Sequence, residues 1–576
     1  MNKTNFLAGL MIVSSLLLAV FSVKDDAITT DESPHITAGY SYLTQKDMRL
    51  NPEHPPLIKD IAAAPLLFQK INFDANHPSW KTNINDQWSA GPNFLYDIGN
   101  DPDKIAFAAR LAVMIFLALL GIMVFIWARE KYGDNMALVA LALTVFSPNI
   151  IANGRYVTTD VGATFAFVIA FYFLAKFLKT PSWKNIIFAG LAFGLAQLIK
   201  FSLVLLVPLY IFIIIASCFV KPPRFNMARA IKSVLAIFVI GYLLVWPVYQ
   251  YHVWNYPIAR QKNDAAQILS SYPIKPIANT VVWMTEKPIL RPYAQYLLGV
   301  LMVSQRAAGG NTAYFQGDIS ATAWKSYFPT VYLLKEPIPV LALILIVLIV
   351  SLAKFRLGKI LARLKEWIGN NIDEFIWITF VVFYWFLSIK GNLNIGLRHV
   401  LPTFPFIYLL TVGQIKKWLA SSGFLGKPLK ILLIGALTVW YIAESALTFP
   451  YYLAYFNELA GGPANGYKRV VDSNLDWGQD LKRLTQYVEK NGIDKIKLDY
   501  FGGGSPQYYL GDRYEKLEAN NLEQRNGWIA VSATLLQNGR GIATKGFDGS
   551  TTHYNWLNQY EPVAKIGYSI FVYRVD

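Results

Sequence analysis

Two acidic residues, Asp31 and Glu32, follow an apolar run over residues 5–23 that contains no charged side chain. That run is about long enough to cross a bilayer, so we expect the acidic pair at one face of a membrane. A carboxylate is costly to place near lipid and is usually retained there for a function. One such function is general-base catalysis, in which a carboxylate accepts the proton of a hydroxyl group. The alternative is a helix N-cap, because acidic groups favour a helix start and residues 33–43 have a helical composition.

A second polar motif, Asn-Pro-Glu-His-Pro-Pro-Leu-Ile-Lys, covers residues 51–59. Its last two prolines favour an extended entry into a helix that we expect over residues 57–68. This arrangement would hold His54 and Lys59 near the membrane face. The alternative is a rigid turn that carries surface charges.

Four further residues stand at predicted ends of apolar runs. Asp160 closes the motif Arg-Tyr-Val-Thr-Thr-Asp and either binds a ligand or caps the next helix. Lys200 interrupts a long apolar stretch, and Arg398 and His399 precede another. Arginine binds phosphate through two parallel hydrogen bonds and lysine through a point charge, whereas the alternative for both is snorkelling to lipid headgroups.

The distribution of apolar runs predicts a polytopic helical membrane protein. The chain has 576 residues, of which 54% are hydrophobic, and its net charge is +16. The basic residues lie in short segments between apolar runs, which indicates membrane topology rather than nucleic-acid binding. The first run is interpreted as a signal anchor, because no small-residue cleavage site precedes Lys24. Cys218 is the single cysteine, so no intramolecular disulfide can form.

Eleven spans are predicted, at residues 5–23, 105–128, 135–152, 161–178, 185–199, 201–219, 231–250, 336–353, 374–390, 397–415 and 431–449. With the N-terminus in the cytoplasm, every even-numbered span ends at a basic loop, namely 129–131, 176–184, 221–232, 354–365 and 416–430. Residues 24–104, residues 251–335 and the C-terminal part would then face outward. The protein is thus expected in the cell (plasma) membrane with its chemistry on the outer face.

The C-terminal part is expected to form a small α/β domain, with residues 1–450 as the membrane core and 451–576 as the outer domain. Residues 477–491 have helical periodicity, with Leu481, Leu484 and Val488 on one face. Strands are predicted at residues 495–501, 528–533 and 568–575. Asp472, Asn474 and Asp476 alternate as in a calcium loop, but the glycine and final acid of such a loop are out of register.

The acidic pair, the His-Pro-Pro-Leu at residues 54–57 and their order in the first outer segment resemble the protein O-mannosyltransferase family, glycosyltransferase family 39, and its bacterial relatives. An arginine before Leu-Pro-x-x-Pro and a second acid after Thr-Thr resemble the family as well. The resemblance is strongest at residues 31–67 and implies the C-type glycosyltransferase fold. It also implies an inverting transfer of sugar from a polyprenyl-phosphate donor to an acceptor hydroxyl.

The same resemblance implies residue roles. Asp31 would be the base, Glu32 and His54 would orient the reacting groups, and Asp160 would help to position the acceptor. The residues that would bind the donor phosphate or the acceptor are Lys59, Asp160, Lys200, Arg398 and His399. The acceptor would be a protein, a lipid or a glycan, and membrane lipids would surround the spans.

Two other functions fit an apolar chain of this length. A transporter or flippase of lipid-linked sugars would often show inverted repeats, which the sequence lacks. A polymerase or ligase of oligosaccharides need not carry the acidic pair followed by His-Pro-Pro. No cofactor is indicated, and the six dispersed histidines do not predict a metal site, although a divalent metal remains an alternative.

Overall fold

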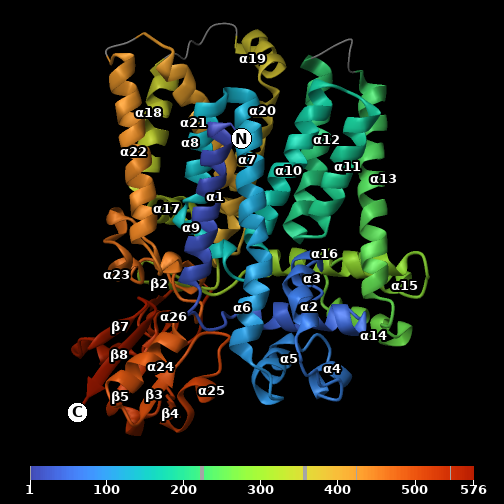
Figure 1. The fold of residues 1–576 in the computed structure, drawn as a ribbon. Helices are drawn as coiled ribbons and strands as arrows, with labels where there is room; N and C mark the ends of the chain where they lie inside the picture. Colours follow the sequence, from blue (N-terminus) through green and yellow to red (C-terminus); the bar gives the residue numbers. More distant parts are fainter. Residues whose placement is uncertain (1, 221–225, 354–359, 423–424, 545) are drawn as a thin grey trace.

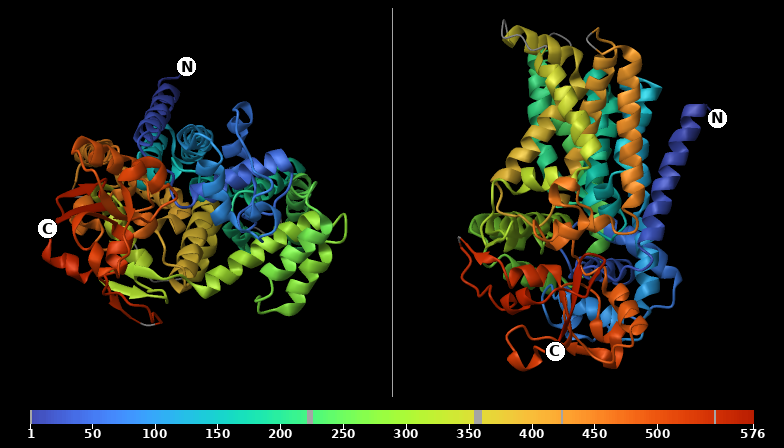
Figure 2. Two further views of the ribbon diagram at one scale, coloured as in Figure 1. Left: turned by 90° about the horizontal axis from the view of Figure 1, so that it is seen from below. Right: turned by 90° about the vertical axis from the view of Figure 1, so that its left-hand side faces the viewer.

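The computed structural model of the chain describes residues 2–220, 226–353, 360–422, 425–544 and 546–576, with side chains described except at 352, 353 and 360–363. Parts of three predicted basic loops, 221–225, 354–359 and 423–424, lie outside the described residues. Figure 1 shows a bundle of long helices above a layer of short helices and strands. The N-terminus lies near the end of the bundle that is far from the C-terminal sheet (Figure 2).

The bundle consists of apolar helices whose ends are set by glycine, proline and capping residues. For example, Gly133 has a positive φ of 85° and ends one helix, and Ser182 caps the start of another. The helices are α1 (Lys3–Ser22), α6 (Pro102–Val113), α7 (Ile115–Tyr132), α8 (Asp134–Val145), α9 (Pro148–Gly154), α10 (Asp160–Lys179), α11 (Trp183–Gln197), α12 (Leu206–Val220), α13 (Met227–His252), α17 (Tyr327–Lys335), α18 (Ile338–Ala353), α19 (Ile360–Asn370), α20 (Ile372–Lys390), α21 (Phe404–Leu419) and α22 (Lys427–Leu447).

The chain is a multi-pass membrane protein. Within the described ranges, seven helices are long and apolar enough to cross a membrane, and two bent helix pairs raise the number to nine. The bends are 57° between α8 and α9 and 114° between α17 and α18, and a proline stands at each break. The predicted number was eleven, and the difference lies at α11 and α21. Helix α11 has 15 residues, which is too short to cross a membrane by itself, and the 3₁₀ turn η3 (Phe201–Leu205) that follows it begins the next span. Helix α21 has 16 residues because the 3₁₀ turns η4 (Leu397–His399) and η5 (Leu401–Thr403) take up the start of its predicted span.

Short helices from the first and second outer segments lie across the lower end of the bundle in Figure 1. The predicted helix over residues 57–68 is confirmed as α3 followed by the 3₁₀ turn η1. The first segment contains α2 (Glu32–Gln45), α3 (Leu57–Ala63), η1 (Ala64–Phe68), α4 (Pro78–Lys81) and α5 (Gln87–Pro92), and the second contains α14 (Ile258–Ile268), α15 (Lys275–Met284) and α16 (Arg291–Gly309).

The C-terminal part contains a five-stranded sheet of order β4-β3-β5-β8-β7, in which β4, β3 and β5 are parallel and the other two neighbouring pairs are antiparallel. Its strands are β3 (Ile496–Asp499), β4 (Tyr514–Lys516), β5 (Gly527–Ser532), β7 (Ala564–Ile566) and β8 (Ile570–Val575). The three predicted strands coincide with β3, β5 and β8. Helix α24 (Leu481–Lys490) packs Leu481, Leu484 and Val488 into the core of this part, as their spacing predicted.

The predicted start of that helix at Trp477 is wrong by four residues. Gly478 has a φ of 88°, which an α-helix does not accommodate. The carbonyl groups of Trp477 and Gln479 instead accept hydrogen bonds from the first outer segment. A second, three-stranded sheet of order β1-β2-β6 also joins distant segments. Strands β1 (Ala313–Phe315) and β2 (Asp318–Ser320) of the second outer segment pair with each other, and β2 also pairs with β6 (Ile542–Ala543).

Candidate functional site

Asp31 stands at the N-cap position of α2, but its side chain makes no capping hydrogen bond. Its Oδ2 instead accepts a hydrogen bond from Nη1 of Arg398 at 2.7 Å. The Asp31 side chain is 28% exposed and that of Arg398 11%. Asp31 therefore occupies the cap position that the helix-cap alternative predicts, but its carboxylate does not cap the helix and can serve another role.

Four of the predicted site residues form one chain of alternating charges. Arg398, in η4, lies between Asp31 and Asp160, whose Oδ2 is 3.6 Å from Arg398 Nη1. Lys200, just before η3, binds Asp160 Oδ1 at 2.6 Å. Asp160 is the first residue of α10, and the N-cap position before it is occupied by Thr159. The chain of charges thus begins at the partly exposed carboxylate of Asp31 and ends at the Lys200 amine, whose side chain is 18% exposed.

Three buried polar atoms in this cluster have no hydrogen-bond partner in the described part of the chain: Asp160 Oδ2, Arg398 Nε and His399 Nε2. Buried polar atoms are nearly always hydrogen-bonded, so unpaired ones call for an explanation. Two cationic side chains with an unpaired arginine donor are suited to an anionic ligand such as a phosphate.

Glu32 differs from its neighbour Asp31. It is fully buried, and its two carboxylate oxygens accept hydrogen bonds from Arg110 at 2.7 and 2.6 Å. The backbone N–H groups of Thr29 and Val157 also donate to it at 3.0 Å. These contacts tie the first outer segment to α6 and to the segment before α10. Consecutive helical residues point about 100° apart, which explains why Asp31 and Glu32 contact different partners.

His54 and Lys59 also lie in the first outer segment but are engaged within it. The ring of His54 contacts the edge of the His35 ring, with 4.8 Å between centroids. Burial, together with the positive charge of nearby Lys59 and Lys200, holds the pKa of His54 well below its usual range, so the ring is neutral at neutral pH. Lys59 is fully buried, and its Nζ donates to Tyr42, Asn51 and the carbonyl of His54 at 2.8–2.9 Å. Lys59 therefore fixes the turn that carries His54.

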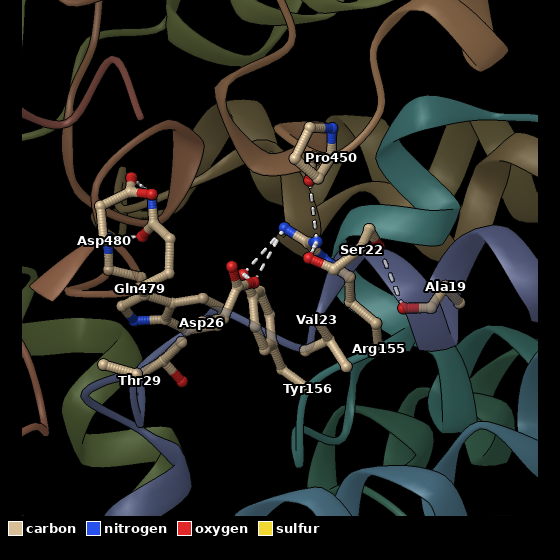
Figure 3. A network of polar contacts seen from close by, with 12 residues as sticks. Ala19, Ser22, Val23, Asp26, Thr29, Arg155, Tyr156, Pro450, Gln479 and Asp480 are labelled. Atoms are coloured by element: carbon tan, nitrogen blue, oxygen red, sulfur yellow. Dashed lines mark hydrogen bonds and ion pairs between the residues drawn. The ribbon is translucent and has the colours of Figure 1, made fainter. Parts of the chain in front are cut away.

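Several residues that contact or surround this cluster belong to no motif that the sequence reveals. The indole of Trp477 lies under Arg398, with 4.2 Å from the guanidinium carbon to the ring centre. Asp26 forms ion pairs with Arg155 at 3.3 Å and Arg483 at 2.6 Å. Figure 3 shows Asp26 between Arg155, Tyr156 and the segment that carries Gln479 and Asp480. The Lys-Asp-Asp run at residues 24–26 is the one feature of the sequence that draws attention to Asp26. It does not predict the partners of Asp26, because they are distant in the sequence.

The cluster provides a carboxylate that can accept a proton and two cations that can stabilise a negative charge. No group of three or more potential metal-ligating side chains is found within the described residues. The buried acid Asp160 and its two cationic neighbours can orient a hydroxyl group or a phosphate by hydrogen bonding.

The comparisons with known proteins bear on the membrane part of the chain. Residues 100–247, which include Asp160 and Lys200, match the family model described as dolichyl-phosphate-mannose-protein mannosyltransferase. No curated protein matches the sequence.

Three solved structures illustrate the likeness. The protein O-mannosyltransferase Pmt1–Pmt2 complex of S. cerevisiae, bound to its sugar donor, is 16% identical with a TM-score of 0.34, and the match covers 44% of this chain and 34% of that chain. This chain thus spans about a third of that protein's length. ArnT of Cupriavidus metallidurans, bound to undecaprenyl phosphate, is 11% identical with a TM-score of 0.30 over 99% of this chain and 98% of that chain. The archaeal oligosaccharyltransferase AglB of Archaeoglobus fulgidus is 11% identical with a TM-score of 0.45 over 91% of this chain and 71% of that chain.

The family match confirms the resemblance that the sequence motifs indicated. Together with the multi-pass helical fold, it confirms the predicted class of enzyme. Residues 100–247 are thus similar to the dolichyl-phosphate-mannose-protein mannosyltransferases, and this match supports the predicted class of membrane glycosyltransferase.

Proposed function

We propose that the protein transfers a sugar from a polyprenyl-phosphate donor to a hydroxyl group of an acceptor outside the cytoplasm, with inversion at the anomeric carbon. The observation that carries this proposal is the contact between Asp31 and Arg398, which places a partly exposed carboxylate beside a phosphate-binding side chain. Dolichyl-phosphate-mannose, the donor in the description of the matched family, is a polyprenyl-phosphate sugar.

The reaction is a single displacement. The acceptor oxygen forms a bond to the anomeric carbon while the bond from that carbon to the phosphate oxygen breaks, and the electron pair leaves with the polyprenyl phosphate. Asp31 accepts the acceptor's proton as the new bond forms. Arg398 and Lys200 stabilise the negative charge that develops on the departing phosphate. Direct attack from the side opposite the phosphate inverts the configuration.

The other predicted residues support this chemistry from fixed positions. Asp160 lies between Arg398 and Lys200 and forms ion pairs with both. Its Oδ2 atom, which has no hydrogen-bond partner in the described ranges, would accept a hydrogen bond from the acceptor. His399 presents its buried Nε2 to the same region. Neutral His54 contributes a hydrogen bond rather than a charge. Glu32 and Lys59 act on the shape of the first outer segment.

The proposed topology places the N-terminus in the cytoplasm and the C-terminal part outside the cell membrane. Residues 1–450 form the membrane core that binds the lipid-linked donor, and residues 451–576 form the outer domain. The acceptor is a protein, a lipid or a glycan of the cell envelope. The basic loops predicted between the spans support this orientation, because lysine and arginine are enriched on the cytoplasmic side.

The test is a transfer assay with purified protein, labelled polyprenyl-phosphate monosaccharides and cell-envelope membranes as the source of acceptor. Wild-type protein should release free polyprenyl phosphate and label the acceptor. Asp31→Asn should lower this rate by about 10²- to 10⁴-fold, since an amide cannot accept the proton. Asp25→Asn is the matched control, because Asp25 is an exposed acid in the same segment and should leave the rate unchanged.

Two outcomes would contradict the proposal. An Asp31→Asn variant that keeps more than about half the wild-type rate would show that Asp31 is not the base. Movement of the lipid-linked sugar across proteoliposomes without release of polyprenyl phosphate would instead identify a flippase.

A further inference from the structure

The segment 472–480, at the start of the C-terminal part, runs directly beside the residues that precede Asp31. The N–H of Ala27 donates to the carbonyl of Gln479 at 2.8 Å, and the N–H of Thr30 donates to the carbonyl of Trp477 at 3.1 Å. A Cβ placed on Gly503 would lie 2.3 Å from the carbonyl oxygen of Thr29, so this contact requires glycine. The backbone that delivers Asp31 is thus paired with the C-terminal part.

The same segment also holds the backbone that delivers Arg398. Ser473 Oγ donates to the carbonyl of Ile395 at 2.5 Å, and the N–H of Leu397 donates to Asn474 Oδ1 at 2.9 Å. Asn474 and Ser473 are buried, so these hydrogen bonds are shielded from water. One stretch of nine residues therefore contacts both partners of the Asp31–Arg398 pair.

Trp477 connects the two contacts. Its side chain is buried, its ring lies under the Arg398 guanidinium at 4.2 Å, and the ring of Tyr156 meets it edge-on with 6.2 Å between centroids. An arginine stacked on an indole is attracted to the ring face and loses the freedom to rotate its planar fork. The stack thus sets the plane in which Arg398 presents Nη1 to Asp31 and keeps the buried Nε free.

The segment is itself firmly anchored. Arg483 forms ion pairs with both Asp26 and Asp480 at 2.6 Å, and Figure 3 shows Asp26 facing Arg155 and Tyr156. Tyr500 Oη donates to the carbonyl of Gly478 at 2.5 Å. Because the anchors join the first outer segment, the segment before α10 and the C-terminal part, a displacement of residues 472–480 would move both Asp31 and Arg398.

We propose that residues 472–480 form the positioning element of the transfer site and that Trp477 orients Arg398 toward the donor phosphate. The C-terminal part is then a component of the catalytic unit, not an accessory domain. This inference rests on the proposed function, in which Arg398 binds the donor. It assigns to Trp477 a positioning role, because Trp477 contacts Arg398 and not the reacting atoms.

The first experiment compares Trp477→Leu with Trp528→Leu in the transfer assay. Trp528 is the matched control because it also stacks on an arginine, Arg574 at 5.1 Å, within the C-terminal sheet. Loss of the Trp477 stack should lower kcat/KM for the lipid donor by roughly 3- to 30-fold. Trp477→Phe should recover part of the loss, since a smaller aromatic face remains. Trp528→Leu should leave donor use unchanged.

A double-mutant cycle separates positioning from general stability. In an Arg398→Ala background, Trp477→Leu should cause little further loss, because the side chain that it orients is gone. Additive losses, or equal losses in Trp477→Leu and Trp528→Leu, would overturn the inference while leaving the proposed function intact.

Hydrogen–deuterium exchange provides a readout that does not depend on activity. Trp477→Leu should increase exchange in peptides that cover residues 27–32 and 395–400 together, and Trp528→Leu should not. Unchanged exchange in both peptides would overturn the positioning role whether or not the protein uses a polyprenyl-phosphate donor. Failure of wild-type protein to release polyprenyl phosphate, with exchange behaving as expected, would overturn the proposed function alone.

Discussion

Asp31 and Arg398 are 367 positions apart in the sequence, yet their side chains form a 2.7 Å hydrogen bond. The proposed base and the proposed phosphate-binding residue therefore form an ion pair with one another. A donor phosphate that binds Arg398 competes with Asp31 for the guanidinium group and leaves the carboxylate free to accept a proton. Under the proposed roles, donor binding and activation of the base are linked through the Arg398 side chain.

Substitution of Arg398 tests this link. Arg398→Lys keeps the charge but loses the two-bond fork, so it should weaken donor use. Arg398→Ala should do so more severely, by about 1.5–3 kcal/mol, which is roughly 10- to 150-fold. Titrations with the lipid donor and with the acceptor check the expectation. Donor dependence that stays unchanged in Arg398→Ala would make this residue a lipid-headgroup anchor, and Lys200 would become the leading phosphate ligand.

The adjacent acids should respond differently to removal of charge. Glu32→Gln leaves Arg110 buried without its anionic partner and should destabilise the protein by about 3–5 kcal/mol. Asp31→Asn should leave stability nearly unchanged, because Asp31 is partly exposed. Thermal unfolding of the two variants in detergent measures the contrast. A stable Glu32→Gln protein with lost activity would mean that Glu32 acts in the chemistry after all.

Asp476 is expected to make stability depend on pH. Burial raises the pKa of Asp476 to about 7, whereas an unfolded aspartate titrates near 4. Between about pH 4 and pH 7 the folded state binds more protons, so this residue's contribution to stability falls as pH rises through that range, by at most about 1.4 kcal/mol per pH unit. Asp476→Asn keeps an acceptor for the N–H of Thr534 and removes the ionisable group.

The comparison of unfolding midpoints at pH 5, 6, 7 and 8 isolates this effect. Asp476→Asn should gain stability relative to wild type toward pH 8 and lose that advantage toward pH 5. A constant difference between the two proteins across the series would show that Asp476 does not titrate in this range.

The proposed orientation can be checked with reporters. A reporter that is active only in the cytoplasm should give no signal when fused after Asp576, and it should give a signal when fused after Gly133, between α7 and α8. The pair of fusions controls for expression. A signal from the C-terminal fusion would contradict the outward position of the C-terminal part.

The sequence allowed prediction of the helical class, the outer segments, and Asp31, Asp160, Lys200 and Arg398 as site residues, which the structure brings together. The alternation of basic loops predicts that the ends of distant spans share one membrane face, and this is why these four residues could be grouped from the sequence. It could not distinguish Asp31 from Glu32, since neighbouring residues diverge only once a helix and its partner Arg110 are fixed. The periodicity of residues 477–491 predicts a helix that includes Trp477. Backbone hydrogen bonds between residues 477–479 and 27–30, which are distant in the sequence, keep Trp477 outside that helix.

The contacts of residues 472–480 also govern the order in which the protein can mature. Synthesis proceeds from the N-terminus, so every membrane helix is made before the stretch that supports Asp31 and Arg398. The three-stranded sheet is completed later still, because β2 must wait for β6 at residues 542–543. A nascent chain whose helices have all been made but which stops before residue 472 therefore lacks the contacts that hold the backbone beside Asp31 and Arg398.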